Sequence, residues 1–99
     1  MLNITKSIEN GKATIALEGR LDTVTSSDLE GALKEIFPEI QQLTLDFEKL
    51  DYISSAGLRV LLSAQKTMAK QDGMKLIHVN ETIMEIFEVT GFSDILTIE

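Results

Sequence analysis

Two stretches near the start of the chain alternate apolar and polar residues and are separated by a turn. The apolar positions are Leu2, Ile4 and Ile8 before the turn, and Ala13, Ile15 and Leu17 after it. An alternation with a period of two predicts strands that bury one side. Asn10-Gly11 lies between the stretches, and this dipeptide is typical of a tight hairpin turn. The first twenty residues are therefore expected to form a β-hairpin.

Three later segments place apolar residues three and four positions apart, the spacing of an amphipathic helix. The first covers residues 27–37, and the polar run before it supplies several candidate N-caps. The second is the longest and begins at Ser54 and Ser55, while the third follows Asn80, which can cap it. The residues that end the three segments are Pro38, Asp72-Gly73 and Gly91. Three helices are predicted.

Three short apolar runs between or after these helices are predicted to be strands. They cover residues 43–47, 76–79 and 95–98. A polar connection that ends at Ile53 should link the first run to the longest helix. The order is then ββαβαβαβ, and such alternation favours right-handed crossovers and a mostly parallel sheet. We expect one α/β domain over residues 1–99, with a single-layer mixed sheet and its helices packed on one face.

The charge of the chain narrows its set of partners. Sixteen acidic residues against nine Lys and Arg give a formal charge of −7, which repels phosphate backbones and anionic head groups. Nucleic acid and membrane surfaces are therefore not expected partners. The N-terminal residues lack the pattern of a signal peptide, and no stretch approaches the roughly 20 apolar residues of a membrane span. A cytoplasmic location is expected.

The residues that could support catalysis or bind a metal are sparse. The chain has no cysteine and a single histidine, His78, which falls in a predicted strand. Asp46, Glu48 and Asp51 lack the glycine and final glutamate of a calcium-binding loop and are expected to lie in a solvated loop. Because no catalytic motif is present either, we expect neither a metal, a cofactor nor an enzymatic activity.

The start of the longest helix is the most informative part of the chain. A helix N-terminus carries free N–H groups and partial positive charge, so a phosphate on a serine there is stabilised. Ser54 and Ser55 can alternatively serve only as N-caps. Gly57 lies just inside the helix, where glycine costs about 1 kcal/mol relative to alanine. It can allow a partner's backbone to approach closely, or it can relieve crowding against a neighbouring strand.

Two segments resemble the STAS family, and specifically the bacterial anti-sigma factor antagonists. Gly19-Arg20-Leu21-Asp22 resembles the Gly-x-Leu-Asp signature that follows the second strand of the family. The segment Ile53-Ser54-Ser55-Ala56-Gly57-Leu58 resembles its Asp-Ser-x-Gly-Leu phosphorylation motif, with Ser54 in the place usually held by aspartate. The order of strands and helices and the closing Gly91-Phe92 fit the same family. The resemblance therefore covers essentially the whole chain.

The resemblance implies a switch that acts by protein binding. Ser55 would be the phosphoacceptor, and the partner would be an anti-sigma factor with a histidine-kinase-like ATPase fold that is also the serine kinase. Binding of the unphosphorylated domain would release a sigma factor, and a serine phosphatase would reset the domain. The implied binding residues are Asp22, Thr23, Ser54, Ser55, Ala56, Gly57 and Arg59.

Other functions are compatible with the same residues. Asp22 and the loop up to Thr25 can equally cap the first helix. STAS-type domains also serve as accessory subunits of lipid-transport ATPases or as other binding modules that are not phosphorylated. These alternatives differ in what they predict for substitutions of Ser55.

Overall fold

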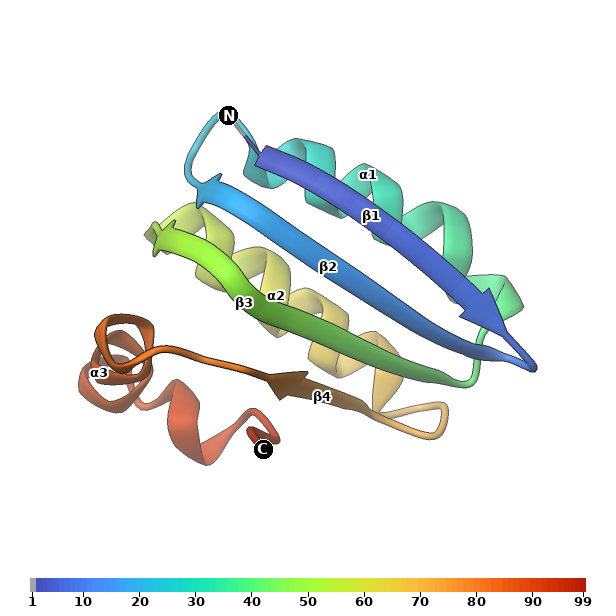
Figure 1. Ribbon diagram of the computed structural model, residues 1–99. Helices are drawn as coiled ribbons and strands as arrows, with labels where there is room; N and C mark the ends of the chain where they lie inside the picture. The colour runs from blue at the N-terminus through green and yellow to red at the C-terminus, as the bar shows by residue number, and fades with distance from the viewer. Residues whose placement is uncertain (1) are drawn as a thin grey trace.

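The computed structural model describes residues 2–99 and contains one mixed four-stranded sheet (Figure 1). The strands are β1 (Leu2–Glu9), β2 (Lys12–Leu21), β3 (Gln42–Ile53) and β4 (Met74–Ile77). They lie side by side in the order β1-β2-β3-β4. The first pair is antiparallel, whereas β3 is parallel to both β2 and β4. The expected mixed sheet is confirmed.

The turn between β1 and β2 has the backbone that a two-residue hairpin needs. Asn10 and Gly11 have φ angles of 53° and 78°, so both are in the left-handed region. This combination matches the right-handed twist of the flanking strands, and Asn-Gly adopts it at little cost. Glu9 pairs with Lys12 across the turn. The hairpin predicted from the sequence is therefore confirmed.

Three α-helices follow the hairpin. They are α1 (Ser26–Ile36), α2 (Ser55–Met68) and α3 (Glu81–Thr90), and short 3₁₀ turns follow α1 at Phe37–Glu39 and α3 at Phe92–Asp94. Gly91 ends α3 in the left-handed conformation, with φ of 82°. Within residues 2–99, none of these helices combines the length and apolar character needed to cross a lipid bilayer.

One predicted connection is instead a strand. Residues 48–53 were expected to form a polar loop, but β3 continues through them to Ile53. The β2–β3 pairing shifts register twice, between Ala16 and Glu18 and between Gly19 and Arg20. These irregularities change which side chains face inward, so Leu50 and Ile53 are both buried although they lie three positions apart. Strand prediction from the sequence looks for buried residues two positions apart, so the spacing of three between Leu50 and Ile53 did not indicate a strand.

Only one isolated bridge remains of the last predicted strand, residues 95–98. Ile98 forms one isolated parallel bridge with Leu76 of β4, and Leu96 is buried. The preceding segment turns as a 3₁₀ helix, so only a few residues remain to run beside the four-residue β4. The chain thus closes against the edge of the sheet with little strand pairing.

The core lies between one face of the sheet and the helices. Figure 1 shows α1 and α2 behind the sheet, with α3 beyond the end of β4. α3 still joins the same core, because the Phe87 ring lies 6.3 Å from the Phe47 ring of β3. The expected arrangement of helices on one face is confirmed. The opposite face of the sheet carries no helix in the part of the chain that the structure describes.

The N-terminus of α2 is seated tightly on the ends of β2 and β3. A Cβ atom added at Gly57 would lie 2.8 Å from Cγ of Leu21 and 2.9 Å from Cγ1 of Ile53. Both distances are shorter than real Cβ contacts, and Gly57 is buried. Relief of crowding inside the domain therefore accounts for this glycine without any partner.

Replacement of Gly57 by alanine should destabilise the domain. The added methyl group would push α2 off the two strands, and overpacking of this kind costs about 1–3 kcal/mol. Gly31→Ala in α1 is the matched control, because no atom lies within 4 Å of the added Cβ there. It should raise stability by about 0.5–1 kcal/mol through helix propensity. Urea denaturation of both variants tests this, and equal shifts of the same sign would contradict it.

Candidate functional site

The segments singled out by the sequence meet at one end of the sheet. Leu21 at the end of β2 pairs with Ile53 at the end of β3, and the N–H of Ser54 donates to the Leu21 carbonyl at 2.8 Å. Because the two strands are parallel, the segments that follow them emerge at the same edge. Figure 1 shows the starts of α1 and α2 together at this end. The loop after β2 therefore lies beside the serine pair.

The two serines have different positions in α2. Ser54 is the N-cap, with extended backbone, and its hydroxyl accepts a hydrogen bond from the N–H of Gly57 at 3.3 Å. Ser55 is the first residue of the helix and is exposed. Its side chain forms no hydrogen bond among residues 2–99. Capping is thus the task of Ser54, and the hydroxyl of Ser55 stays available at the positive end of the helix dipole.

The loop between β2 and α1 is held by Asp22. One oxygen of its carboxylate accepts hydrogen bonds from the N–H groups of Val24 and Thr25, both at 3.0 Å. The Thr25 hydroxyl lies 3.1 Å from the same oxygen and 2.8 Å from the Arg20 carbonyl. The bond from the Thr25 N–H, with help from the other donors, lowers the pKa of Asp22. Asp22 therefore orders the turn that leads into α1, where Thr25 is the N-cap residue.

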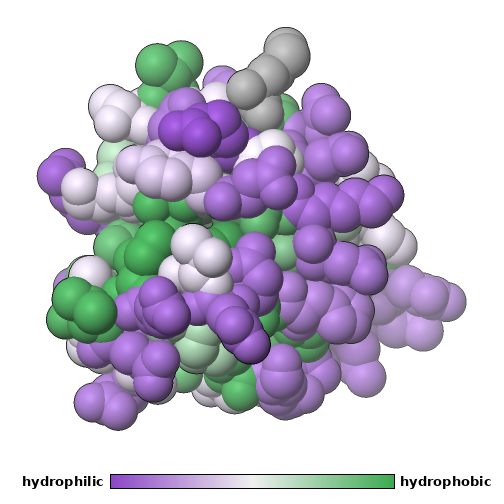
Figure 2. Space-filling model, turned by 60° about the vertical axis from the view of Figure 1, so that its left-hand side comes forward, coloured by the Kyte–Doolittle hydropathy of each residue, from purple (hydrophilic) through white to green (hydrophobic). Residues whose placement is uncertain are grey.

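This turn exposes residues that could meet a partner. Thr23 is exposed, and Val24 is 79% exposed although it is apolar. Next to the loop, the guanidinium carbon of Arg20 lies 4.2 Å from the ring centre of Tyr52, a cation–π contact. Figure 2 shows hydrophobic side chains at the surface among hydrophilic ones when this side of the molecule comes forward.

The remaining predicted residues divide into accessible and buried ones. Arg59 is exposed and lies four residues after Ser55, so both are on one face of α2. Ala56 is half-buried, whereas Gly57 is buried. The loop up to Thr25, which contains Val24, was expected at the binding surface, whereas Tyr52 was not. The signal that could have found Tyr52 is an aromatic residue directly before the motif that begins at Ile53.

The residues that could hold a metal lie elsewhere, on the face of the sheet without helices. Nδ1 of His78 is 2.9 Å from Oδ1 of Asp46. The bond to Asp46 raises the pKa of His78. Partial burial acts to raise the pKa of Asp46, but hydrogen bonds from the Glu48 N–H and His78 outweigh burial and lower it. Glu48 and Asp51 lie in β3 and not in the solvated loop expected from the sequence, whereas Asp46 lies within the strand predicted over residues 43–47.

The role of Asp22 can be tested through its pH dependence. Its pKa is lowered in the folded state, so its ionised form stabilises the fold above the unfolded value of about 3.9. This contribution is lost as the pH falls through the lower folded value. Asp22→Ala should therefore lower the denaturation midpoint most at neutral pH, and the difference from the parent chain should shrink below about pH 4. A difference that stays constant down to pH 3 would contradict this account.

Comparisons with known proteins agree with the resemblance found in the motifs. The family described as Mlab, STAS domain matches residues 4–97. BtrV of Bordetella bronchiseptica, named as a candidate anti-sigma factor antagonist, is 30% identical over 99 residues, covering 98% of this chain and 85% of that protein. The anti-sigma-B factor antagonist of Bacillus subtilis is 24% identical over 98 residues, covering 98% and 90% of the two chains.

Solved structures share the fold. An anti-sigma factor antagonist from Mycobacterium paratuberculosis superposes with a TM-score of 0.89 at 18% identity, covering 99% of this chain and 85% of that one. SpoIIAA of Bacillus in its phosphorylated form gives a TM-score of 0.77 at 16% identity, covering 98% and 91%. The family match spans nearly all of the described sheet and helices, together with both motifs at the sheet end. The chain therefore belongs to the STAS domain family.

Proposed function

We propose that this protein is an anti-sigma factor antagonist that is switched off by phosphorylation of Ser55. The observation that carries the proposal is the separation of roles at the start of α2. Ser54 caps the helix, so the exposed hydroxyl of Ser55 is free for modification without loss of the cap. The names of the relatives, which include anti-sigma factor antagonists of several bacteria, support the same function.

A phosphate at Ser55 would affect the domain and its partner in opposite ways. Within the domain, about −1.5 to −2 charges would sit at a helix N-terminus, where the dipole contributes about 0.3–1 kcal/mol in their favour. A partner packed on the same residues would have to desolvate the dianion, which weakens binding unless an arginine faces it. The fold thus tolerates the modification that the complex does not.

The proposed partner is an anti-sigma factor with a histidine-kinase-like ATPase fold that also acts as the serine kinase. The unphosphorylated domain would bind it and release a sigma factor, and a serine phosphatase would restore binding. The domain itself would act by binding and not as an enzyme, in the cytoplasm. SpoIIAA of Bacillus, which shares the fold, is known in phosphorylated and unphosphorylated forms.

The proposed partner surface combines the loop after β2 with one face of α2. Its accessible members are Thr23, Val24, Ser55, Ala56 and Arg59. Asp22 would act indirectly, because its carboxylate is engaged in holding the loop. Gly57 would also act indirectly, since it is buried and lets α2 sit close to the strands. Val24 is the most exposed apolar residue of this surface.

Substitutions of Ser55 separate the switch from folding. Ser55→Ala should bind the anti-sigma factor like the parent chain, while Ser55→Asp should bind about tenfold or more weakly. Both should lose phosphate incorporation, measured by intact mass after incubation with the kinase and ATP–Mg²⁺. Both should also melt close to the parent chain, because the helix N-terminus accepts the aspartate charge.

Ser63→Ala is the matched control, because Ser63 is another exposed serine of α2. It should still gain one phosphate and bind normally. Unmodified mass of the parent chain throughout, or equal binding by Ser55→Ala and Ser55→Asp, would reject the switch. Equal tolerance of both Ser55 variants is what an accessory subunit of a lipid-transport ATPase, or another module that is not phosphorylated, would show.

The serine in place of the usual aspartate can be tested at the same helix end. Ser54→Ala removes the acceptor for the Gly57 N–H and should lower stability by about 1 kcal/mol in urea denaturation. Ser54→Asp keeps an acceptor there and adds a negative charge near the dipole, so stability should be retained or slightly raised. Equal destabilisation by the two variants would show that the cap does not depend on an oxygen acceptor.

A further inference from the structure

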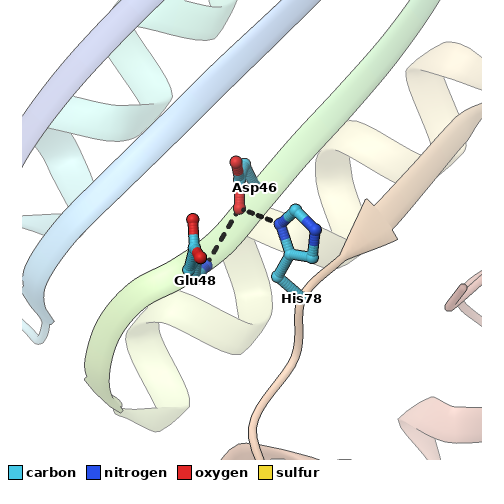
Figure 3. A network of polar contacts seen from close by, with 3 residues as sticks. All are labelled: Asp46, Glu48 and His78. Carbon is cyan, nitrogen blue, oxygen red and sulfur yellow. Dashed lines mark hydrogen bonds and ion pairs between the residues drawn. The ribbon is translucent and has the colours of Figure 1, made fainter.

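The face of the sheet without helices brings three potential metal ligands together. They are Asp46 and Glu48 of β3 and His78, which directly follows β4 (Figure 3). One ligand atom from each side chain lies within 4.8 Å of the other two. His78 and Asp46 are already in contact at 2.9 Å. The group therefore combines an imidazole nitrogen with two carboxylates from two separate segments.

The sheet explains why residues so distant in sequence meet. Asp46 and Glu48 are two positions apart on β3, and the closeness of their ligand atoms places both side chains on the same side of the sheet. Asp46 pairs with Ile77 of β4, which places the next residue, His78, beside it. The His78 backbone has φ of 57°, which turns the chain out of the strand at this point. In the sequence His78 is 30 or more residues from Asp46 and Glu48, so this arrangement could not be predicted from residue spacing.

The carboxylate of Asp46 is oriented by the protein itself. The N–H of Glu48 donates to its Oδ1 at 3.0 Å, and the side chain of Asp46 is only 22% exposed. Such a bond to a ligating carboxylate fixes its direction in metal sites. The side chain of His78 is 55% exposed, so solvent reaches the group from that side. The carboxylate of Asp46 is thus prepositioned, and the group is accessible to solvent.

We propose that Asp46, Glu48 and His78 bind one divalent transition-metal ion of the Zn²⁺ class. One imidazole nitrogen with two carboxylate oxygens suits zinc and its neighbours better than Mg²⁺ or Ca²⁺, which prefer oxygen ligands alone. Two carboxylates and a neutral imidazole carry a charge of −2, which matches the ion. Zinc bonds of about 2.0–2.1 Å require ligand atoms about 3.4 Å apart. The His78 and Asp46 atoms, now 2.9 Å apart, therefore have to separate slightly, and the exposed Glu48 has to rotate inward by a short distance.

The neighbouring charges are mixed. On the β2 side, a hollow of about 210 Å³ is lined by Thr5, Glu18, Asp46, Glu48 and Lys49. Glu18 adds a further negative charge near the ligands, whereas Lys49 opposes a cation.

A bound ion would connect β3 to the segment that leads from β4 into α3. The site lies in the middle of β3, away from Ser55, and does not depend on the proposed phosphorylation.

Binding can be followed at a single residue, because His78 is the only histidine and the chain has no cysteine. Untagged protein is titrated with ZnCl₂ by calorimetry, and the imidazole signals of His78 are observed by NMR. We expect saturable binding of one Zn²⁺ with a shift of these signals. Asp46→Asn, Glu48→Gln and His78→Asn should each weaken binding by about tenfold or more. Asparagine is chosen at position 78 because it tolerates a positive φ.

Asp51→Asn is the matched control, since Asp51 is an exposed carboxylate of the same strand outside the group. It should bind Zn²⁺ like the parent chain, and circular dichroism should show all variants folded. The proposal is overturned if no saturable binding occurs, or if Asp46→Asn and His78→Asn bind as tightly as the parent chain. A His78 response to Mg²⁺ equal to that for Zn²⁺ would overturn the assignment to a transition metal.

Discussion

The first turn of α2 packs closely on the ends of β2 and β3, and this contact positions both family motifs. It requires a residue without a side chain at position 57, because Leu21 and Ile53 fill the space that a Cβ would occupy. With the helix seated there, its first turn lies over the sheet edge where two parallel strands end. That placement presents Ser55 at the surface and brings the loop held by Asp22 beside it.

The start of α2 divides helix capping and surface exposure between two adjacent serines. A residue that caps a helix is engaged in a hydrogen bond, so its modification would disturb the fold. Adjacent serines avoid this disturbance, because Ser54 caps the helix and Ser55 does not. The exchange of the family's usual aspartate for Ser54 keeps the acceptor and removes a negative charge. The hydrogen bond at the helix N-terminus is therefore kept without that charge.

The open face of the sheet follows from the same architecture. With α1 and α2 packed on one face and α3 closing the core through Phe87, the other face is left to polar side chains. There the strand pairing of Asp46 with Ile77 sets the position of His78. Two separate surfaces therefore arise from one sheet, one at its end and one across the middle of β3.

The sequence was sufficient to predict the hairpin, the three helices and the two motifs, because these depend on local periodicity and turn chemistry. It also named Ser55 and Asp22. It could not show that residues 48–53 are a strand, since shifts of register against β2 set which side chains turn inward. Only the tertiary structure separated Ser54 from Ser55 and joined His78 to Asp46. The contact between His78 and Asp46 depends on how β3 and β4 pair, and the residue spacing within one segment does not determine that pairing.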